Sequence, residues 1–126
     1  MSGKRMDGQE FRRWFAGVFG VVLVVVGGLG LIAPDLGSTS TAPAYDTIHV
    51  ANGLLVIALA VRGRPVGIRA FLVGFGAIDL YQAVASHWHW FPESLFRWTS
   101  TDDFLHVALG VLLVVVGAWP VRRTAV

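Results

Sequence analysis

Four apolar segments separated by short polar stretches run along the chain. They predict helices at about residues 12–33, 46–62, 66–87 and 102–120, with an amphipathic, aromatic loop at 87–101. The first and third match the roughly 20 residues that a helix needs to cross a ~30 Å hydrocarbon core. The second and fourth become long enough when their polar first turns are counted. We therefore expect residues 1–126 to form one all-α integral membrane domain, a four-helix bundle.

An eight-residue pattern, D-x-x-H-V-A-x-G, opens two of these segments. The copies are Asp46–Gly53 and Asp103–Gly110, at an offset of 57 residues. The Phe-Gly pair at 19–20 aligns with the Phe-Gly pair at 75–76 at an offset of 56. A repeat of this length predicts two tandem helical hairpins. Because helices two and four run in the same direction, we expect a parallel repeat about an axis along the membrane normal.

Composition narrows the class of protein. The 126 residues are 55% hydrophobic and 14% charged, with a mean hydropathy of +0.64. This is too apolar and too poor in charge for an ordinary soluble domain. The formal charge of +2 comes without a basic stripe interleaved with aromatics, so we expect no nucleic-acid partner. The absence of cysteine excludes thiolate catalysis and cysteine-ligated iron–sulfur clusters.

The positive charges predict the orientation in the membrane. They precede the first helix, surround the loop between helices two and three, and follow helix four, whereas the other two loops contain only Arg97. By the positive-inside rule, both termini should be cytoplasmic. The basic start and the first apolar run look like a signal peptide. The run is about 20 residues, longer than the usual h-region, so we expect a retained helix.

Seven polar residues are expected to gather in the outer half of the bundle: Asp46, His49, Asn52, Asp79, Gln82, Asp103 and His106. Helical spacing places each aspartate of the D-x-x-H pattern on the same face as its histidine. We favour a structural role, in which the bundle is locked and the helix starts are capped by Asp46 or Thr47 and by Thr101, Asp102 or Asp103. The alternative is that His49 and His106 flank a b-type haem or bind a metal, with each aspartate orienting a ring. No cofactor is the leading expectation.

Asp79 admits two further interpretations. A carboxylate inside a membrane span is costly and should face the protein interior. It either hydrogen-bonds a neighbouring helix or forms a proton or cation site. The first-helix counterparts of Asp79 and Gln82 are Leu23 and Val26, so the polar site is one-sided. The His87-x-His89 pair is a weak metal signal because alternate residues diverge on a helix, and interfacial aromatic packing is favoured there.

The segment FRWTSTDDFLHVALGV at 96–111 resembles the final-helix signature of an uncharacterised bacterial membrane family, domain-of-unknown-function family 4383. That signature is of the type T-x-D-[ND]-x-L-H-[LV]-x-L-G. Residues 47–53 resemble more loosely the family's earlier x-I-V-H-x-x-x-G segment. The resemblance covers most of 12–119 and implies a four-helix fold in a bacterial inner membrane, with both histidines as family features and no known activity. Asp46 and Asp79 depart from the family pattern.

We expect a small accessory or structural membrane subunit, in contact with lipid and with a membrane-protein partner or further copies of itself. Its size, its glycine faces and its aromatic outer loop favour this class. An enzyme is not expected, because the serines lie outside any nucleophile-elbow pattern. The alternatives are a bis-histidine haem or metal protein and a small proton- or cation-linked transporter centred on Asp79.

Overall fold

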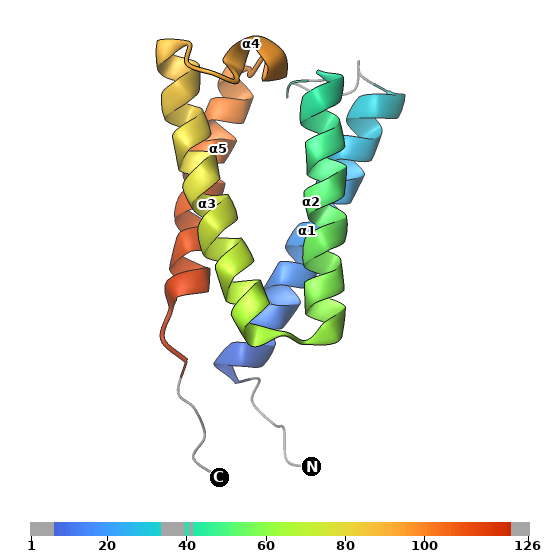
Figure 1. The fold of residues 1–126 in the computed structure, drawn as a ribbon, viewed down its shortest axis with the longest axis vertical. Helices are drawn as coiled ribbons and strands as arrows, with labels where there is room; N and C mark the ends of the chain where they lie inside the picture. The colour runs from blue at the N-terminus through green and yellow to red at the C-terminus, as the bar shows by residue number, and fades with distance from the viewer. Residues whose placement is uncertain (1–6, 34–39, 41, 122–126) are drawn as a thin grey trace.

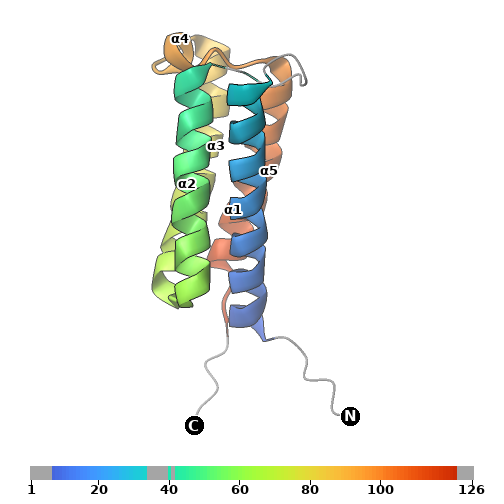
Figure 2. The same ribbon diagram turned by 90° about the vertical axis from the view of Figure 1, so that its right-hand side faces the viewer.

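Two helical hairpins packed side by side make up the structure. The computed structural model describes residues 7–33, 40 and 42–121, which form α1 (Gly8–Ile32), α2 (Pro43–Arg62), α3 (Pro65–Trp88), α4 (Glu93–Phe96) and α5 (Ser100–Ala118). α1 packs along α2, and α3 packs along α5 (Figures 1 and 2). No strand occurs in these ranges. The predicted all-α four-helix bundle of two tandem hairpins is confirmed.

Four of the helices are long and apolar enough to span a membrane, which makes this a multi-pass membrane protein. Exposed tryptophans mark both ends of the bundle. Trp14 and Trp119 lie at the end where α1 begins, and Trp88 and Trp90 lie at the opposite end (Figure 1). Exposed indoles at these two levels are typical of the aromatic belts at the two faces of a bilayer. Throughout, the end where α1 begins is called the basic end, and the opposite end is called the α4 end.

The shorter helices begin earlier than the apolar pattern predicted. α2 starts with Pro43, whose fixed φ and missing N–H suit the first position of a helix. Its N-cap, Ala42, makes no side-chain cap bond, so Asp46 lies within the first turn and does not cap it. α5 starts at Ser100 because Thr99 and Asp102 form a capping box. The loop predicted at 87–101 also contains the short helix α4.

Both hairpins contain the same close contact between glycines. A Cβ atom added at Gly20 would lie 2.8 Å from the carbonyl oxygen of Gly53, and one added at Gly76 would lie 2.9 Å from that of Gly110. These pairs correspond at the offsets of 56 and 57 that relate the two halves of the sequence. Small residues let transmembrane backbones approach closely, where dispersion forces hold them together. The sequence repeat is therefore also a repeat in packing.

The core between the hairpins lies near the axis of this repeat. The rings of Phe19 and Phe75, which occupy equivalent positions, meet edge to face with their centroids 5.6 Å apart. A residue that contacts its own counterpart must lie close to the axis that relates them. The buried residues around this contact are Ala16, Phe19, Leu23, Val56, Ile68, Leu72 and Leu113.

Two arginines at the start of α1 bind the C-terminal ends of α2 and α5. Arg12, only 6% exposed, donates to the carbonyl oxygens of Val116, at 3.0 Å, and of Trp119, near the end of α5. Arg13 donates to those of Ala60, at 2.5 Å, and Val61, at 3.0 Å, in the last turn of α2. The last carbonyls of a helix have no partner within the helix, and cations are favoured there. Arg12 thus joins the two hairpins at the basic end.

Candidate functional site

The predicted polar residues lie in the half of the bundle nearer the α4 end, and they differ in burial. Four of the seven are buried: Asp46, Asp79, Gln82 and His106. The other three are half-buried: His49, Asn52 and Asp103. The structure does not join all seven into one network. Instead it forms a connection between the hairpins around a residue outside the predicted set, and a separate pair on α3.

Asp102 is the centre of the connection between hairpins. Its carboxylate accepts hydrogen bonds from the backbone N–H of Thr99 at 2.8 Å and from the Thr99 hydroxyl at 2.9 Å. It also accepts from the backbone N–H of Ser40 at 2.7 Å, across from the first hairpin. The residue is 2% exposed. A buried carboxylate needs such donors, because an ionised group without them is strongly disfavoured.

Tyr45 connects α2 to α5 through its hydroxyl group. Its hydroxyl donates to Oδ1 of Asp102 at 3.3 Å and lies 2.7 Å from Nε2 of His106. Because the phenol has one proton, a Tyr45 that donates to Asp102 must accept the proton on Nε2 of His106. Nδ1 of His106 is then an acceptor, and it has no partner within the described ranges. In the haem or metal alternative Asp103 orients His106, whereas the structure links that ring to Asp102 through Tyr45.

A second contact joins the hairpins beside this one. The Ser40 hydroxyl donates to the carbonyl oxygen of Phe96 in α4 and accepts from the backbone N–H of Ala42 at 3.3 Å. The Phe96 ring packs on Tyr45, with centroids 5.4 Å apart. The residues just before α2 therefore attach to both α4 and the start of α5, which closes the α4 end of the bundle.

Ser40 and Tyr45 take part in the contacts between the hairpins and were not predicted. Asp102 was expected only as one of the residues that could cap the last helix, and it does cap α5. Two weak signals in the sequence point to these residues. Thr99 and Asp102 have the spacing of a capping box, with aspartate in place of the usual glutamate or glutamine. Tyr45 stands at the repeat position that corresponds to Asp102. Nothing in the sequence marked Ser40.

The other members of the D-x-x-H pattern are less connected. The Asp46 carboxylate packs directly against the backbone of Gly30 in α1, and its Oδ2 has no hydrogen-bond partner among the described residues. The Asn52 amide donates to the carbonyl of Ile48 in its own helix at 2.9 Å. His49 meets the Tyr45 ring edge-on at 4.1 Å, and its Nδ1 lacks a partner in the described part. Among the described residues, none of these three side chains makes a hydrogen bond to another helix.

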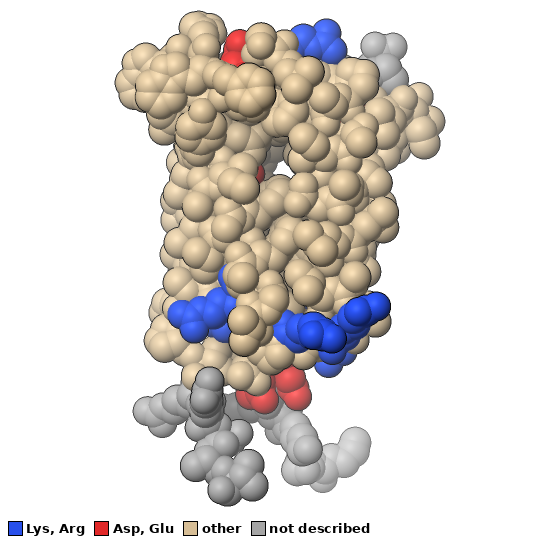
Figure 3. Space-filling view, in the orientation of Figure 1, with Lys and Arg blue, Asp and Glu red and all other residues tan. Residues whose placement is uncertain are grey.

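Asp79 and Gln82 form a separate pair on α3. The Gln82 amide donates to Oδ1 of Asp79 at 3.3 Å. Asp79 is 3% exposed, and Oε1 of Gln82 is buried with no partner in the part of the chain that the structure describes. Figure 3 shows a hollow between the hairpins in this half of the molecule, with an acidic side chain visible in its wall. At the equivalent positions the first hairpin carries the apolar residues Leu23 and Val26.

The histidines do not fit a haem or a metal centre. Across residues 7–33, 40 and 42–121, no group of three histidine or acidic side chains is placed to hold a metal ion. The Tyr45 ring contacts His49 at 4.1 Å and His106 at 5.9 Å, and its hydroxyl binds the Nε2 atom that an axial ligand would use. A porphyrin between the two imidazoles would have to displace this tyrosine.

No family model, no curated protein and no solved structure matches the chain. The function is therefore inferred from the geometry.

The aromatic residues at the α4 end are exposed. Trp88 and Trp90 stack at 5.6 Å, and Phe91 is 75% exposed. α3 continues to Trp88, so the side chains of His87 and His89 diverge and do not form a chelating pair. His89 instead lies 3.7 Å from the carboxylate of Glu93. This end of the molecule offers an apolar surface with few charges.

Proposed function

We propose that this protein is an accessory subunit of a larger assembly in the bacterial inner membrane, with both termini cytoplasmic and no catalytic activity of its own. The observation that carries the proposal is the connection between Tyr45 in α2 and Asp102 and His106 in α5. It joins one half of the chain to the other through three buried polar side chains. Because these side chains bond to each other, they support a structural role.

The aromatic surface at the α4 end supports a protein partner. Trp88, Trp90, Phe91 and Leu95 are all exposed there. Contiguous exposed apolar residues mark sites of contact with proteins or membranes. Aromatic residues are also enriched at the centres of protein interfaces. We assign this surface to a neighbouring membrane protein, with a second copy of the chain as the alternative occupant.

The distribution of charge supports the orientation. Lysine and arginine side chains form a belt near the basic end, with a smaller group at the α4 end (Figure 3). The start of α1 and the end of α5 both lie at the belt (Figure 1). Basic residues are enriched on the cytoplasmic side of membrane proteins. The resemblance of residues 96–111 to family 4383 stays a proposal, supported by the order and spacing of the D-D-x-L-H-V-x-L-G residues at 102–110, with Ser100 where the signature has threonine.

A photo-reactive residue in place of Phe91 tests the subunit proposal in native membranes. We expect irradiation to give one discrete covalent adduct with another membrane protein, identified by mass spectrometry. The matched control places the same group at Val111, which is exposed in the middle of α5 and should react only with lipid. An adduct with a second copy would indicate a homo-oligomer. Lipid adducts alone at both positions would contradict the proposal.

A second candidate, a proton- or cation-linked function, is favoured by the Asp79–Gln82 pair. Oε1 of Gln82 is buried without a partner in the described chain, beside a buried carboxylate and a hollow. Intramembrane ionisable residues commonly mark such pathways. Proteoliposomes with a trapped pH dye test it. The candidate requires proton flux that is lost in Asp79→Asn and kept in Asp103→Asn, and absence of flux in the unsubstituted protein would exclude a proton pathway.

A further inference from the structure

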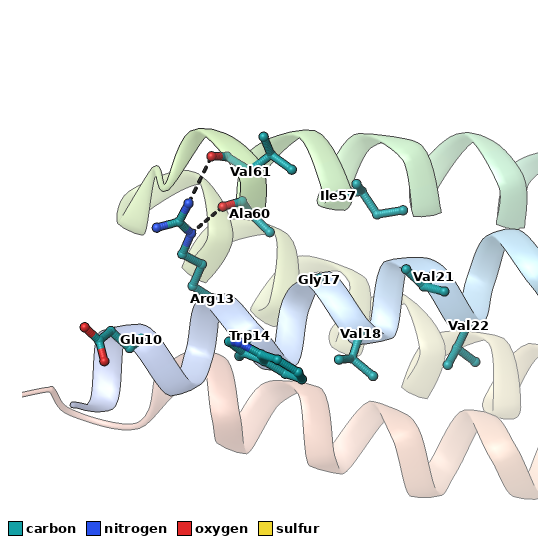
Figure 4. A pocket seen from close by; sticks show the side chains of 10 residues that line it. All are labelled: Glu10, Arg13, Trp14, Gly17, Val18, Val21, Val22, Ile57, Ala60 and Val61. Atoms are coloured by element: carbon teal, nitrogen blue, oxygen red, sulfur yellow. Dashed lines mark hydrogen bonds between the residues drawn. The ribbon is translucent and has the colours of Figure 1, made fainter. Parts of the chain in front are cut away.

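An apolar groove runs along the outside of the first hairpin, between α1 and α2 (Figure 4). Its volume is about 820 Å³, within the range of small-molecule sites. Its lining residues are Glu10, Arg13, Trp14, Gly17, Val18, Val21, Val22, Ile57, Ala60 and Val61. Polar residues occur only at the basic end of this set. The rest is aliphatic, apart from the indole of Trp14.

The groove has the length of one leaflet of a bilayer. It extends along α1 from Glu10 to Val22, which at 1.5 Å per residue is roughly 18 Å. One leaflet contributes about half of the ~30 Å hydrocarbon core. Because Trp14 is exposed near the polar end of the groove, that end lies at the membrane–water interface. The groove therefore runs from the interface to about mid-membrane, as the acyl chain of a lipid does.

The polar end of the groove carries one positive and one negative side chain. Arg13 uses Nε and one terminal nitrogen to bind the carbonyls of Ala60 and Val61 (Figure 4). A guanidinium has five N–H donors. Two hydrogen bonds of Arg13 to described residues are seen, which leaves further donors for a ligand in this part of the structure. Glu10 is exposed, and its carboxylate forms no ion pair within the described ranges. Two opposite charges at the interface match a zwitterionic headgroup.

We propose that this groove binds phosphatidylethanolamine. The phosphate is bound by the guanidinium of Arg13, the ammonium donates to the carboxylate of Glu10, and one acyl chain lies in the groove over Gly17. Charge-assisted hydrogen bonds of both kinds are stronger than neutral ones. Phosphatidylglycerol has no ammonium and brings a net negative charge near Glu10. Phosphatidylcholine has an ammonium with no N–H to donate.

The second hairpin lacks the features that define this site. At the repeat positions of Glu10, Trp14 and Gly17 it carries Val66, Ala70 and Val73. The acid and the indole are thus missing there, and a larger side chain stands where Gly17 leaves space. Since Arg13 does have a counterpart in Arg69, a basic residue at the interface is common to both hairpins and does not by itself define a lipid site.

Native mass spectrometry from nanodiscs tests the proposal. The protein is released from nanodiscs that contain equal amounts of phosphatidylethanolamine, phosphatidylglycerol and phosphatidylcholine. We expect one bound lipid, with phosphatidylethanolamine preferred about fivefold, the ratio that roughly 1 kcal/mol gives. Glu10→Gln should lose this preference while still binding lipid. Gly17→Val, which introduces the residue of the second hairpin, should lower retention of all three lipids.

Gly28→Val is the matched control for the groove, because a Cβ atom at Gly28 would meet nothing within 4 Å. It should retain lipid like the unsubstituted protein. Equal retention of the three lipids by the unsubstituted protein, or an unchanged preference in Glu10→Gln, would overturn the proposal. A dimer without bound lipid would also overturn it, in favour of a second copy in the groove. Glu10 is exposed, so its variant tests the headgroup even if Gly17→Val fails to fold.

Discussion

The two hairpins share a backbone arrangement and differ in what their first helices carry toward the α4 end. Each hairpin is held by a glycine pair, Gly20 with Gly53 or Gly76 with Gly110, at matching repeat positions. α3 then carries Asp79 and Gln82 where α1 carries Leu23 and Val26. The comparison separates two requirements. Close approach of the helices within a hairpin depends on the small residues, whereas the chemistry between the hairpins depends on side chains that can differ from one half to the other.

The largest effect is expected from filling a glycine contact. Gly53→Leu would drive its side chain against the carbonyl oxygen of Gly20, which lies 2.7 Å from an added Cβ atom, and the backbones would have to separate. We expect a loss of about 3 kcal/mol in the free energy of unfolding in detergent, the upper range for overpacking. Gly110→Leu should lose a similar amount. Circular dichroism during chemical denaturation measures both.

Gly74→Leu is the control for these two variants, since nothing lies within 4 Å of an added Cβ atom there. It should unfold like the unsubstituted protein. A large loss at Gly53 with none at Gly110 would show that the second hairpin is held by other contacts. The two glycine contacts would then be alike in geometry but would not contribute equally to stability.

The next largest loss of stability is expected when the connection of Tyr45 with Asp102 and His106 is broken. Tyr45→Phe removes the hydroxyl that links Asp102 and His106 and leaves both without that partner. We expect a loss of about 2 kcal/mol, typical of an unsatisfied buried polar group. His106→Ala should cost a similar amount. Because the two residues act together, their double variant should lose much less than the sum of the single losses.

His49→Ala is expected to lower stability less than His106→Ala, because His49 contacts Tyr45 by ring packing alone. None of these variants should change the visible absorption spectrum, because Tyr45 stands where a haem would have to bind. A Soret band in the unsubstituted protein, lost on substitution of either histidine, would contradict this arrangement. Unchanged melting in both histidine variants would contradict the structural role.

A smaller loss of stability is expected for substitutions of the two arginines of α1, and it should differ between them. Arg12 binds the end of α5 in the other hairpin, whereas Arg13 binds the end of α2 in its own. Arg12 is buried and Arg13 is exposed. We therefore expect Arg12→Gln to lose about 1.5 kcal/mol and Arg13→Gln about 0.5 kcal/mol. Thermal melting in detergent compares them, and an equal loss would show that the bond of Arg12 between the hairpins stabilises the protein no more than the bond of Arg13 within its own hairpin.

The smallest change is expected when the polar pair is converted to its apolar counterpart. The double variant Asp79→Leu with Gln82→Val introduces the residues that stand at positions 23 and 26 of the first hairpin. Replacing both partners of a buried hydrogen bond by apolar groups of similar shape can be nearly neutral or stabilising. We expect stability to change by less than about 1 kcal/mol, and upward. A marked loss in thermal melting would show that the pair supports the fold.

Much of the fold could be predicted because its determinants are local. The apolar segments set the number of long helices, and the two copies of the D-x-x-H pattern with the Phe-Gly pairs set the hairpins. The Asp79–Gln82 pair was also predicted, since helical spacing places the two residues on one face. The start of α4 was not predicted, because a four-residue helix has no periodicity to detect.

The contacts between hairpins could not be predicted in the same way. Whether Asp102 or Asp103 meets α2 depends on how α5 is rotated about its own axis, and neighbouring residues differ by 100° on a helix. That rotation is set by the capping box at Thr99 and by packing against Tyr45 and Phe96. The D-x-x-H pattern placed Asp103 in the polar group, whereas Asp102, which faces α2, was expected only as a possible cap.

The contact of Phe19 with Phe75 has a consequence for how such a protein can diversify. In a dimer of identical hairpins, every substitution is made twice, and residues near the two-fold axis must tolerate their own copies. A carboxylate there would be brought toward a second carboxylate of like charge. Fusing the two hairpins into one chain removes this constraint. Each half can then accept a substitution that would be unfavourable if it also occurred at the equivalent position of the other half.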